Sequence, residues 1–242
     1  MRAALRKFYL DQTFNPGLTG LLVNPFYHAR KGLYRAIAGL AGSLRGRVLD
    51  VGCGQKPYEH LFACEQYVGL EFDSEQNRMN KKADYFYAGG AFPFGNAEFD
   101  SAVCNQVLEH VFNPDDFVRE IARVLKPGGA LLLTVPFVWN EHEQPYDYAR
   151  YSSFGLRALL ERNGFTVGSL FKTNAGVPAL AQLAAGYLYE VTHTRSFPFN
   201  LLLNLLLIAP VNIAGAIFGR LLPAVQDIYL DNVVFATRKV QP

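Results

Sequence analysis

The sequence predicts an α/β fold built on a mainly parallel sheet. Seven short apolar segments of strand type alternate with helical segments from residue 47 onward, as a parallel sheet requires. The first strand segment, residues 47–51, runs into a glycine-rich turn, a combination typical of nucleotide-binding βαβ units. The alternation stops only at a long apolar stretch, residues 175–222, which indicates a helical insertion before the last strand.

Length and composition fit a folded domain. The 242 residues, half of them apolar, can bury a full core as one α/β domain or as a domain with an insertion. The three cysteines form no Cys-x-x-Cys pair, so neither a disulfide framework nor a zinc site is indicated, and a reducing cytosol is expected. The first residues lack an apolar core of signal-peptide length, so secretion is not expected.

Charge is distributed unevenly along the chain. Residues 1–47 hold eight Lys and Arg against a single acidic residue, Asp11, whereas the remainder is net acidic. We expect a basic helical N-terminal segment, residues 1–45, whose interleaved aromatic residues suit an anionic membrane surface or a phosphate-bearing substrate. Nucleic acid is not the expected partner, and a solvated helical face is the plain alternative.

Periodicity and turn residues place the elements of the core. Apolar residues spaced to share one face predict a helix over residues 26–44. Asn113 and Pro114 suit the N-cap and first position of a later helix, and Asn163-Gly164 ends the next one. The predicted strands are residues 47–51, 66–71, 84–88, 99–104, 130–135, 165–171 and 228–237. The helices between them are residues 57–63, 74–82, 114–125 and 152–162.

The insertion has the composition of a membrane segment but the topology of a returning chain. Residues 201–222 are long and apolar enough to cross a bilayer. However, strand 228–237 must lie beside strand 165–171, and Asn204, Pro210 and Asn212 interrupt the apolar pattern. We therefore predict helices over residues 178–191, 199–209 and 211–222 that contact membrane lipid or a second subunit, in a homodimer. A self-contained core packed on the sheet is the alternative. The predicted domains are residues 1–45, a core of residues 46–174 and 226–242, and the insertion, residues 175–225.

The turn after the first strand has the residues of a nucleotide site. Gly52 and Gly54 let the backbone approach a ligand closely, with Asp50 just before them. Glu71 follows Asp50 by 21 residues, the spacing of a ribose-binding carboxylate in a βαβ fold. Pro57 stands where a dinucleotide-binding turn needs its third glycine, which disfavours an NAD(P) dehydrogenase.

Four motifs in order resemble a known family. VLDVGCG at 48–54, AFPF at 91–94, VLEHV at 107–111 and LKPGG at 125–129 are similar to motifs of the type-11 branch of class I S-adenosylmethionine-dependent methyltransferases. The resemblance covers residues 46–172 and the last strand. It implies a Rossmann-like, seven-stranded, mostly parallel sheet with an antiparallel last strand, and S-adenosyl-L-methionine as cofactor.

Within that resemblance, separate residues are expected for the parts of the cofactor. The backbone of Gly52, Cys53 and Gly54 would hold the methionine end, with Asp50 reaching the ammonium through water, and Glu71 would accept both ribose hydroxyls.

The adenine end is less well provided for. Relatives carry an acidic residue before the AFPF-like segment, where this chain has Gly89 and Gly90. The N–H of Ala91 would reach the adenine ring between apolar walls formed by Phe72 and Phe92. The residues expected beneath the cofactor are Asn105 and Gln106, after the fourth strand.

The loop after the fifth strand is the candidate acceptor site. Its sequence, HEQPYDYAR at residues 142–150, resembles segments of methyltransferases from cell-surface glycan pathways. We predict His142 as general base, with Tyr146, Asp147 and Arg150 orienting the acceptor. In the alternative interpretation, Asp147 and Arg150 pair only to fix the loop. No metal is predicted, because His142 and Glu143 lack a spaced third ligand.

The resemblance implies in-line transfer of a methyl group from a sulfonium to a nucleophile, and leaves the choice of acceptor open. The first expectation is a hydroxyl on a glycan or its lipid-linked precursor, and the second is O-methylation of a quinone or other lipid. A cofactor-binding module without turnover is a further alternative, since Gly90 replaces the usual acid. The protein is expected in the cytoplasm, at the inner face of the membrane.

Overall fold

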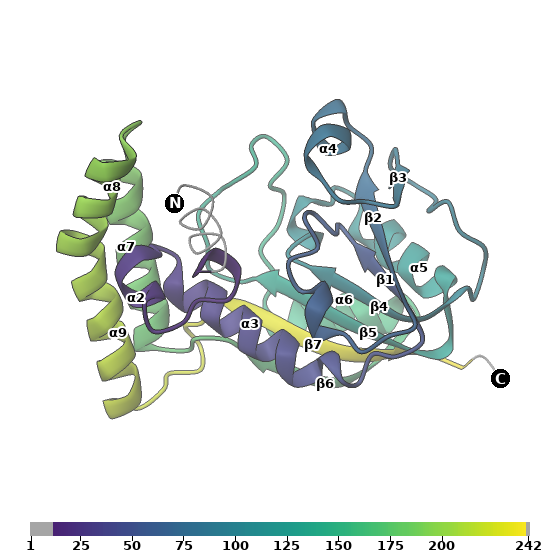
Figure 1. Cartoon of the computed structure of the whole chain (residues 1–242). Coiled ribbons are helices and arrows are strands. Elements are labelled where there is room, and N and C mark those ends of the chain that lie inside the picture. Colours follow the sequence, from purple (N-terminus) through teal and green to yellow (C-terminus); the bar gives the residue numbers. More distant parts are fainter. Residues whose placement is uncertain (1–11, 241–242) are drawn as a thin grey trace. The chain divides into compact units, whose positions relative to one another are not determined.

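The computed structural model describes residues 12–240 (Figure 1). The chain forms two compact units. One comprises Ala36–Phe171 with the C-terminal strand, and the other comprises the described residues up to Arg35 together with Lys172–Asp231. The basic residues Arg2, Arg6 and Lys7 of the predicted N-terminal segment lie outside the described residues.

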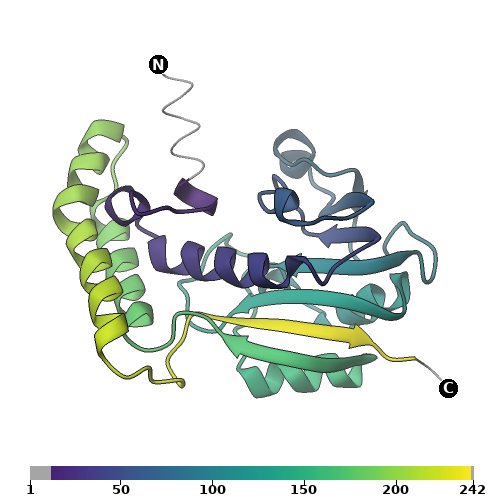
Figure 2. The ribbon, with the colours of Figure 1, turned by 60° about the horizontal axis from the view of Figure 1, so that its bottom comes forward.

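The first unit contains a seven-stranded sheet in the order β3-β2-β1-β4-β5-β7-β6. Six strands are parallel and the last is antiparallel, which confirms the predicted fold class. Figure 2 shows the antiparallel β7 inserted between β5 and β6. The strands are β1 (Arg47–Val51), β2 (Gln66–Phe72), β3 (Tyr85–Tyr87), β4 (Phe99–Asn105), β5 (Leu125–Pro136), β6 (Phe165–Lys172) and β7 (Asp231–Arg238).

The direction of strand addition reverses at β1. From β1 the chain adds β2 and β3 on one side and then returns to place β4 on the other. Asp50 of β1 is in register with Gly69 of β2 and with Val103 of β4. Such a reversal leaves room for a ligand beyond the carboxyl ends of the strands, so the segments following β1, β2 and β4 are those that reach it.

Helices α5 (Pro114–Val124) and α6 (Ser153–Arg162) supply apolar faces to the core of this unit. Phe117, Ile121 and Leu160 are buried together with strand residues, including Phe99 and Phe165, which are fully enclosed. Asn113 occupies the N-cap of α5 as predicted, although its side chain makes no capping hydrogen bond. Burial of the amphipathic face therefore holds α5 in place more than its cap does.

Two elements of the core differ from the prediction. The helix expected over residues 57–63 is a single 3-10 turn, Glu59–Leu61. It ends early because β2 begins soon after it, where the N–H groups of Glu65 and Gln66 donate to the carbonyl of Gly46, the residue before β1. Strand β5 begins at Leu125 rather than 130, and its early pairing with β4 contains a register irregularity between Phe99 and Ser101. The Pro-Gly-Gly turn is therefore absorbed into the strand as a bulge. The short α4 (Glu75–Asn80) lies inside the helix expected over 74–82.

The second unit is helical. It contains α2 (Gly20–Val23), the start of α3 (Tyr27–Ala41), α7 (Val177–Thr192), α8 (Phe197–Leu203) and α9 (Ala209–Leu221). The prediction of separate helices over 199–209 and 211–222 was wrong, because Phe197–Leu221 is one continuous helix. A π-helical turn, Asn204–Ile208, joins α8 to α9, and the Ala209 N–H donates to the carbonyl of Asn204, five residues back. This widened turn lies just before Pro210, whose ring conflicts with regular α-helical bonding. The wider bonding pattern accommodates the ring, so the helix continues past the proline.

Buried amides connect these helices to the N-terminal segment. The side chain of Asn212 donates to the carbonyls of Leu21 and Asn24, and that of Asn204 donates to the carbonyl of Val23. Gln182 of α7 donates to the Pro25 carbonyl and accepts from the Ala29 N–H. The asparagines that interrupt the apolar pattern in the sequence therefore satisfy backbone groups inside the unit.

The segment Phe197–Leu221 is 25 residues long and, by length and composition, apolar enough to cross a membrane. That property alone is weak grounds for a membrane span, because core helices of soluble proteins share it. Only 28% of its most apolar 18-residue stretch is buried, so much of the apolar surface of the helix is exposed.

Candidate cofactor and acceptor site

The turn after β1 is fixed by backbone bonds to the end of β2. The N–H groups of Gly52 and Cys53 both donate to the Leu70 carbonyl, at 2.8 and 3.2 Å. Gly52 and Gly54 have φ of 73° and 53°, and a Cβ on Gly52 would lie 2.3 Å from the side chain of Val107. Glycine is therefore required at Gly52 by both backbone conformation and space.

Glu71 lies at this turn, as its spacing predicted. Its side chain leaves β2 toward the glycines, where Oε2 accepts the Gly54 N–H at 2.9 Å and Oε1 accepts the Phe72 N–H at 3.1 Å. The residue is only 8% exposed. Each carboxylate oxygen retains a second lone pair, so the group can still accept from two ribose hydroxyls.

These bonds also define what the turn offers a ligand. All three N–H groups of residues 52–54 already donate within the protein. The N–H groups therefore hold the loop and Glu71 in place, and the glycines leave the backbone open to close approach by a ligand.

Asp50 is a buried acid at the end of β1. It is 5% exposed, and Oδ2 accepts a hydrogen bond of 2.8 Å from the hydroxyl of Tyr67. Burial raises the pKa of Asp50 to about 7, although the Tyr67 bond opposes the shift, and the negative charge of Glu71 adds to it. A cation placed nearby would favour the ionised carboxylate. The contact between Tyr67 and Asp50 was not predicted from the sequence. The one feature that could have indicated it is a hydroxyl group on the strand paired with β1.

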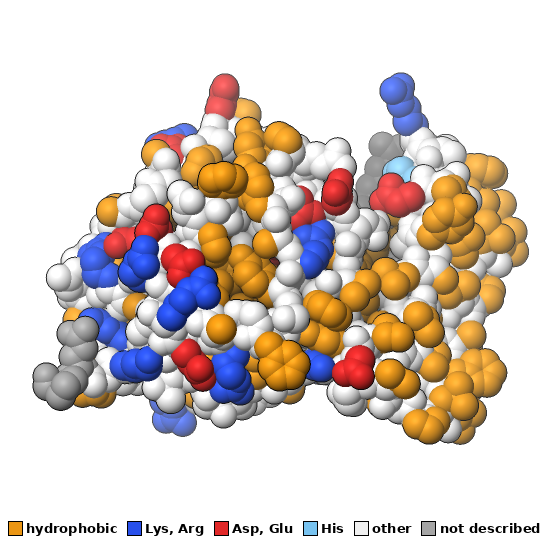
Figure 3. Space-filling model, turned by 180° about the vertical axis from the view of Figure 1, so that it is seen from behind, with side chains coloured by type: hydrophobic (Ala, Val, Ile, Leu, Met, Phe, Trp, Pro, Cys, Tyr) orange, Lys and Arg blue, Asp and Glu red, His pale blue; other side chains and the backbone are white. Residues whose placement is uncertain are grey.

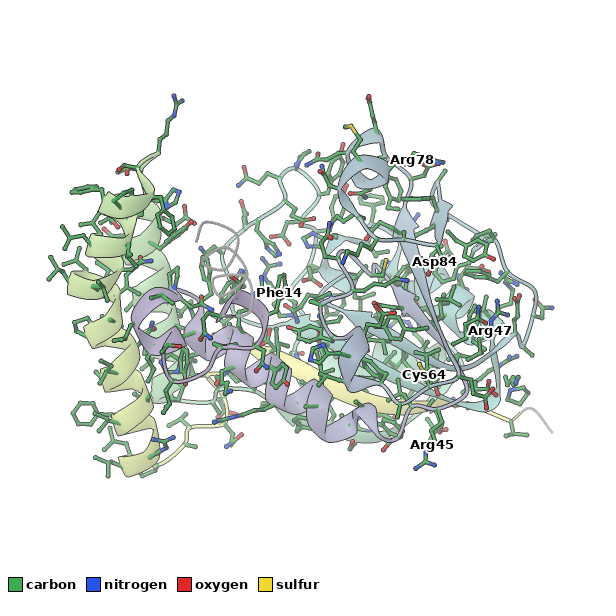
Figure 4. All side chains as sticks on the ribbon, in the orientation of Figure 1. Phe14, Arg45, Arg47, Cys64, Arg78 and Asp84 are labelled. Atoms are coloured by element: carbon green, nitrogen blue, oxygen red, sulfur yellow. The ribbon has the colours of Figure 1, made fainter. Side chains whose placement is uncertain are left out.

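Cys53 is a small, inert turn residue. It is 3% exposed, and burial, reinforced by the charge of Asp50, raises the pKa of its thiol to about 12. Lys56, the nearest cation in the sequence, instead forms an ion pair of 2.6 Å with Asp84, which is labelled in Figure 4. Asp84 also accepts the Gly69 N–H at 2.7 Å, so it braces β2.

The expected adenine residues separate into exposed and buried groups. Phe72 is 49% exposed and makes an edge contact with Tyr87, and Ala91 is also exposed. Phe92 is buried against Phe117, and its N–H donates to Glu120 at 2.8 Å. Phe72 therefore offers an exposed aromatic ring to a nucleobase. Phe92 is buried and anchors the segment to the core.

Asn105 and Gln106 end β4 and share one buried partner, Thr134 of β5. The Thr134 hydroxyl donates to Asn105 Oδ1 and accepts from Gln106 Nε2 at 3.3 Å. The Gln106 N–H also donates to the Thr134 carbonyl at 3.0 Å, which holds Gln106 in a left-handed conformation with φ of 57°. The side chains of Asn105 and Gln106, at the end of β4, are thus oriented by a residue of the neighbouring strand. Thr134 was not predicted, because in the sequence it is only one polar residue within an apolar strand.

The loop after β5 is braced by Asp147 and Arg150. The guanidinium donates to both carboxylate oxygens, at 2.5 and 2.7 Å, and also to the Asn140 and Ala149 carbonyls. The Asp147 carboxylate further accepts the His142 N–H at 2.9 Å and is only 4% exposed. These contacts support the loop-fixing interpretation of the pair, while Tyr146 projects to solvent at 62% exposure.

His142 lies beside residues from a different segment. Its ring makes an edge contact with that of His110, at a centroid distance of 4.7 Å, and its Nδ1 lies 3.3 Å from Asp147 Oδ2. Burial, followed by the neighbouring His110, lowers the pKa of His142. His110 and Glu109 come from the VLEHV motif at residues 107–111, for which no site residue was predicted. The fold brings both to the loop that follows β5.

The fold and this site together define a class of protein. A seven-stranded sheet with an antiparallel last strand, a glycine turn after β1 and a carboxylate from the end of β2 at that turn form the frame of a class I S-adenosylmethionine-dependent methyltransferase.

Comparison with known proteins gives the same family. A family model described as a methyltransferase domain matches residues 49–133. An O-methyltransferase of Aspergillus nomiae, rstn1, is 30% identical over 164 residues, which cover 57% of this chain and 73% of that protein. A fatty-acid O-methyltransferase of Mycolicibacterium smegmatis is 36% identical over 114 residues, covering 42% of this chain and 41% of the relative.

Among solved structures, phosphoethanolamine N-methyltransferase 2 of Haemonchus contortus, in complex with S-adenosyl-L-methionine, matches with a TM-score of 0.55. It is 17% identical, and the match covers 97% of this chain and 60% of the other, which shows a common fold. The chain belongs to the class I S-adenosylmethionine-dependent methyltransferases, with S-adenosyl-L-methionine as cofactor.

Proposed function

We propose that the protein transfers a methyl group from S-adenosylmethionine to a hydroxyl oxygen on a glycan or a lipid-linked glycan precursor. The observation that carries donor use is the Glu71 carboxylate held at the Gly54 turn by a hydrogen bond of 2.9 Å. The assignment of a hydroxyl as methyl acceptor is supported by His142. This residue is an uncharged proton acceptor in the loop that follows the carboxyl end of β5.

Each part of the cofactor has a candidate partner in this arrangement. Glu71 would accept the ribose hydroxyls, and Phe72 would offer its exposed ring to adenine. The methionine end would lie against residues 52–54, where the buried carboxylate of Asp50 compensates its ammonium. Bound in this way, the cofactor would direct its sulfonium toward Asn105 and Gln106 and the loop that follows β5.

The transfer itself is an in-line displacement. A new bond forms between the acceptor oxygen and the methyl carbon as the carbon–sulfur bond breaks, and the hydroxyl proton leaves to a base. Alignment and exclusion of water supply much of the acceleration. His142 suits the base role because Nδ1 faces Asp147, which leaves Nε2 for the proton, and because its lowered pKa keeps the ring neutral near pH 7.

O-methylation of a quinone or other lipid is the second candidate. The exposed apolar helix Phe197–Leu221 favours an acceptor that resides in or near a membrane, which suits both a lipid and a lipid-linked sugar. Two relatives are named as O-methyltransferases, one of them acting on fatty acids. We rank the glycan first on the sequence of loop 142–150 alone, HEQPYDYAR, from which a glycan-pathway acceptor was predicted.

The test combines donor binding with product analysis. Calorimetric titration with S-adenosylmethionine and, in parallel, with NADH should show binding of the former alone. Incubation of the protein with methyl-labelled donor and extracted glycolipids, quinones or fatty acids, followed by mass spectrometry, should place the label on a sugar hydroxyl. Label on a quinone or fatty acid would select the second candidate. Donor binding without any labelled product from all three pools would indicate a cofactor-binding module.

A further inference from the structure

Three ligand-type side chains from two separate segments converge at the loop that follows β5. Glu109 and His110 belong to the short 3-10 turn Leu108–His110, and His142 belongs to the loop. One ligand atom from each of the three lies within 4.8 Å of the other two. The sequence had suggested only the adjacent pair His142 and Glu143, so this three-residue combination emerges from the fold alone.

Each of the two imidazoles has its Nδ1 beside oxygen acceptors. His110 Nδ1 lies 2.8 Å from the carbonyl oxygen of Tyr146, an acceptor only, so this nitrogen carries the proton. His142 Nδ1 lies 3.3 Å from Asp147 Oδ2 and 3.3 Å from the Asn140 carbonyl oxygen, which favours the same tautomer. Each ring therefore presents an unprotonated Nε2. Histidines that bind metals show this pattern, with the second nitrogen donating to a carboxylate or a carbonyl.

The third side chain contributes negative charge in a buried position. Glu109 is 0% exposed, and its Oε1 lies 3.8 Å from His110 Nε2. A carboxylate enclosed to this degree gains more from a nearby cation than a solvated carboxylate would. His142, whose side chain is 34% exposed, closes the cluster on the solvent side and leaves an entry path.

We propose that Glu109, His110 and His142 form a binding site for a divalent transition-metal ion of the zinc type. Two imidazole nitrogens and one carboxylate oxygen are a ligand set of catalytic zinc centres and leave at least one position open. Zinc–ligand bonds of roughly 2.0–2.2 Å place tetrahedral ligand atoms roughly 3.4 Å apart, so binding requires an inward movement of about 1 Å. Rotation of the partly exposed His142 ring provides that movement.

The site has a consequence for the chemistry proposed above without resting on it. A cation held by His142 Nε2 would remove this nitrogen as a direct proton acceptor, and the ion would then supply the acidification of a bound water instead. The metal-free protein keeps His142 as the base. Metal binding is measured without an acceptor, so failure of the acceptor assignment leaves this inference intact, and the reverse also holds.

The experiment uses the full chain, freed of any histidine tag and stripped with a chelator. Titration with Zn²⁺ in a calorimeter, and with Co²⁺ by visible absorption, should show one site per chain. His110→Ala and His142→Ala should each weaken binding at least about a hundredfold, and Asp147→Asn, which loses an orienting contact, by about ten- to a hundredfold. His60→Ala, which removes a histidine outside the cluster, is the matched control and should bind as the unmodified protein does.

Glu109→Gln tests the carboxylate, with circular dichroism to check folding because the residue is enclosed. If that variant does not fold, the two histidine variants decide the matter. Absence of one-to-one binding in the unmodified protein would overturn the proposal. Binding that survives both His110→Ala and His142→Ala would overturn it equally, because the ion would then occupy another place.

Discussion

The Oε2 atom of Glu71 accepts a hydrogen bond from the backbone N–H of Gly54 at 2.9 Å, joining two residues that are 17 positions apart in the chain. This bond ties the segment after β1 to the end of β2. It orients a carboxylate, 8% exposed, at the glycine turn where we propose that the cofactor binds. The same side chain therefore serves both the shape of the turn and the expected contact with the ribose.

Replacement of Glu71 by alanine should weaken S-adenosylmethionine binding about ten- to a hundredfold. The variant loses charge-assisted hydrogen bonding to the ribose, which contributes roughly 1.5–3 kcal/mol in total. Isothermal titration calorimetry measures the change, and Glu65→Ala, an exposed acid before β2, should leave affinity unchanged. Unaltered affinity in a folded Glu71→Ala protein would contradict the ribose assignment.

Donor affinity should depend on pH through Asp50. Because burial raises the pKa of Asp50 to about 7, the free protein carries this group protonated in mildly acidic solution, and binding of an ammonium must release that proton. Affinity should therefore rise by up to about tenfold between about pH 5.5 and about pH 6.5. The donor's own amino group stays charged in this range, since α-amino groups titrate at about 7.7–8.0.

Asp50→Asn supplies the control, because it keeps the size of the side chain and removes its titration. The variant should bind more weakly at about pH 7, with an affinity that stays flat across the acidic range. An equal pH dependence in both proteins would mean that another group releases the proton.

The sequence predicted the frame of the site better than its interior. The mainly parallel sheet and the Glu71 position follow from the alternation of elements and from a fixed spacing after Asp50. Thr134 and Tyr67 were not predicted, since a hydroxyl in an apolar strand shows its role only when the neighbouring strand is in register. The Glu109–His110–His142 cluster was missed for a related reason. His142 lies more than 30 residues after Glu109 and His110, and the three meet only because β5 returns the chain to the end of β4.

The helical unit shows a different limit of sequence reasoning. Pro210 was expected to separate two helices, residues 199–209 and 211–222, as it would in a regular α-helix. The π-helical turn before it shifts the bonding pattern by one residue, so that the helix continues. Such a turn has no simple pattern of residue types, and only the backbone bonds reveal it.

Arg150→Ala should destabilise the protein by about 2–3 kcal/mol. The change leaves the Asp147 carboxylate, 4% exposed, without its bidentate partner, and it removes donors from the Asn140 and Ala149 carbonyls. Chemical denaturation measures the loss in free energy of unfolding. Arg157→Ala, which removes an exposed arginine of α6, should change it by less than about 0.5 kcal/mol. A loss as small for Arg150→Ala would show that the pair is free to bind an acceptor instead.

His142→Ala should lower turnover by a factor of about a hundred to ten thousand, with donor affinity unchanged. This is the range that general-base help contributes. The assay uses chelator-stripped enzyme with the acceptor found by product analysis, so that loss of the base is separated from loss of a metal ligand. Tyr146→Phe, which keeps the exposed ring of the same loop, serves as the comparison and should retain most of the turnover. Full turnover in stripped His142→Ala enzyme would remove the base role.

The exposed apolar side chains of α8, the π-helical turn and α9 should bind lipid bilayers. Leu206 and Phe218 are 62% and 50% exposed, and Figure 3 shows hydrophobic side chains gathered over the helices at the right of the view. Burying half of a large apolar side chain contributes about 1 kcal/mol, so replacing both with serine should weaken vesicle binding roughly thirtyfold. Phe154→Ser, 84% exposed on α6, is the matched control and should float with liposomes as the unmodified protein does.

Vesicles with and without anionic lipid separate two contributions to this binding. Stronger flotation with anionic lipid would assign part of the affinity to the basic N-terminal residues, and equal flotation would assign it to the apolar helices. Light scattering distinguishes the remaining outcomes. A dimer that does not float would place a second subunit on the helices. A monomer that does not float would mean that the insertion is a self-contained core. Its apolar side chains would then contact neither lipid nor a second subunit, and would stabilise only the fold of the chain itself.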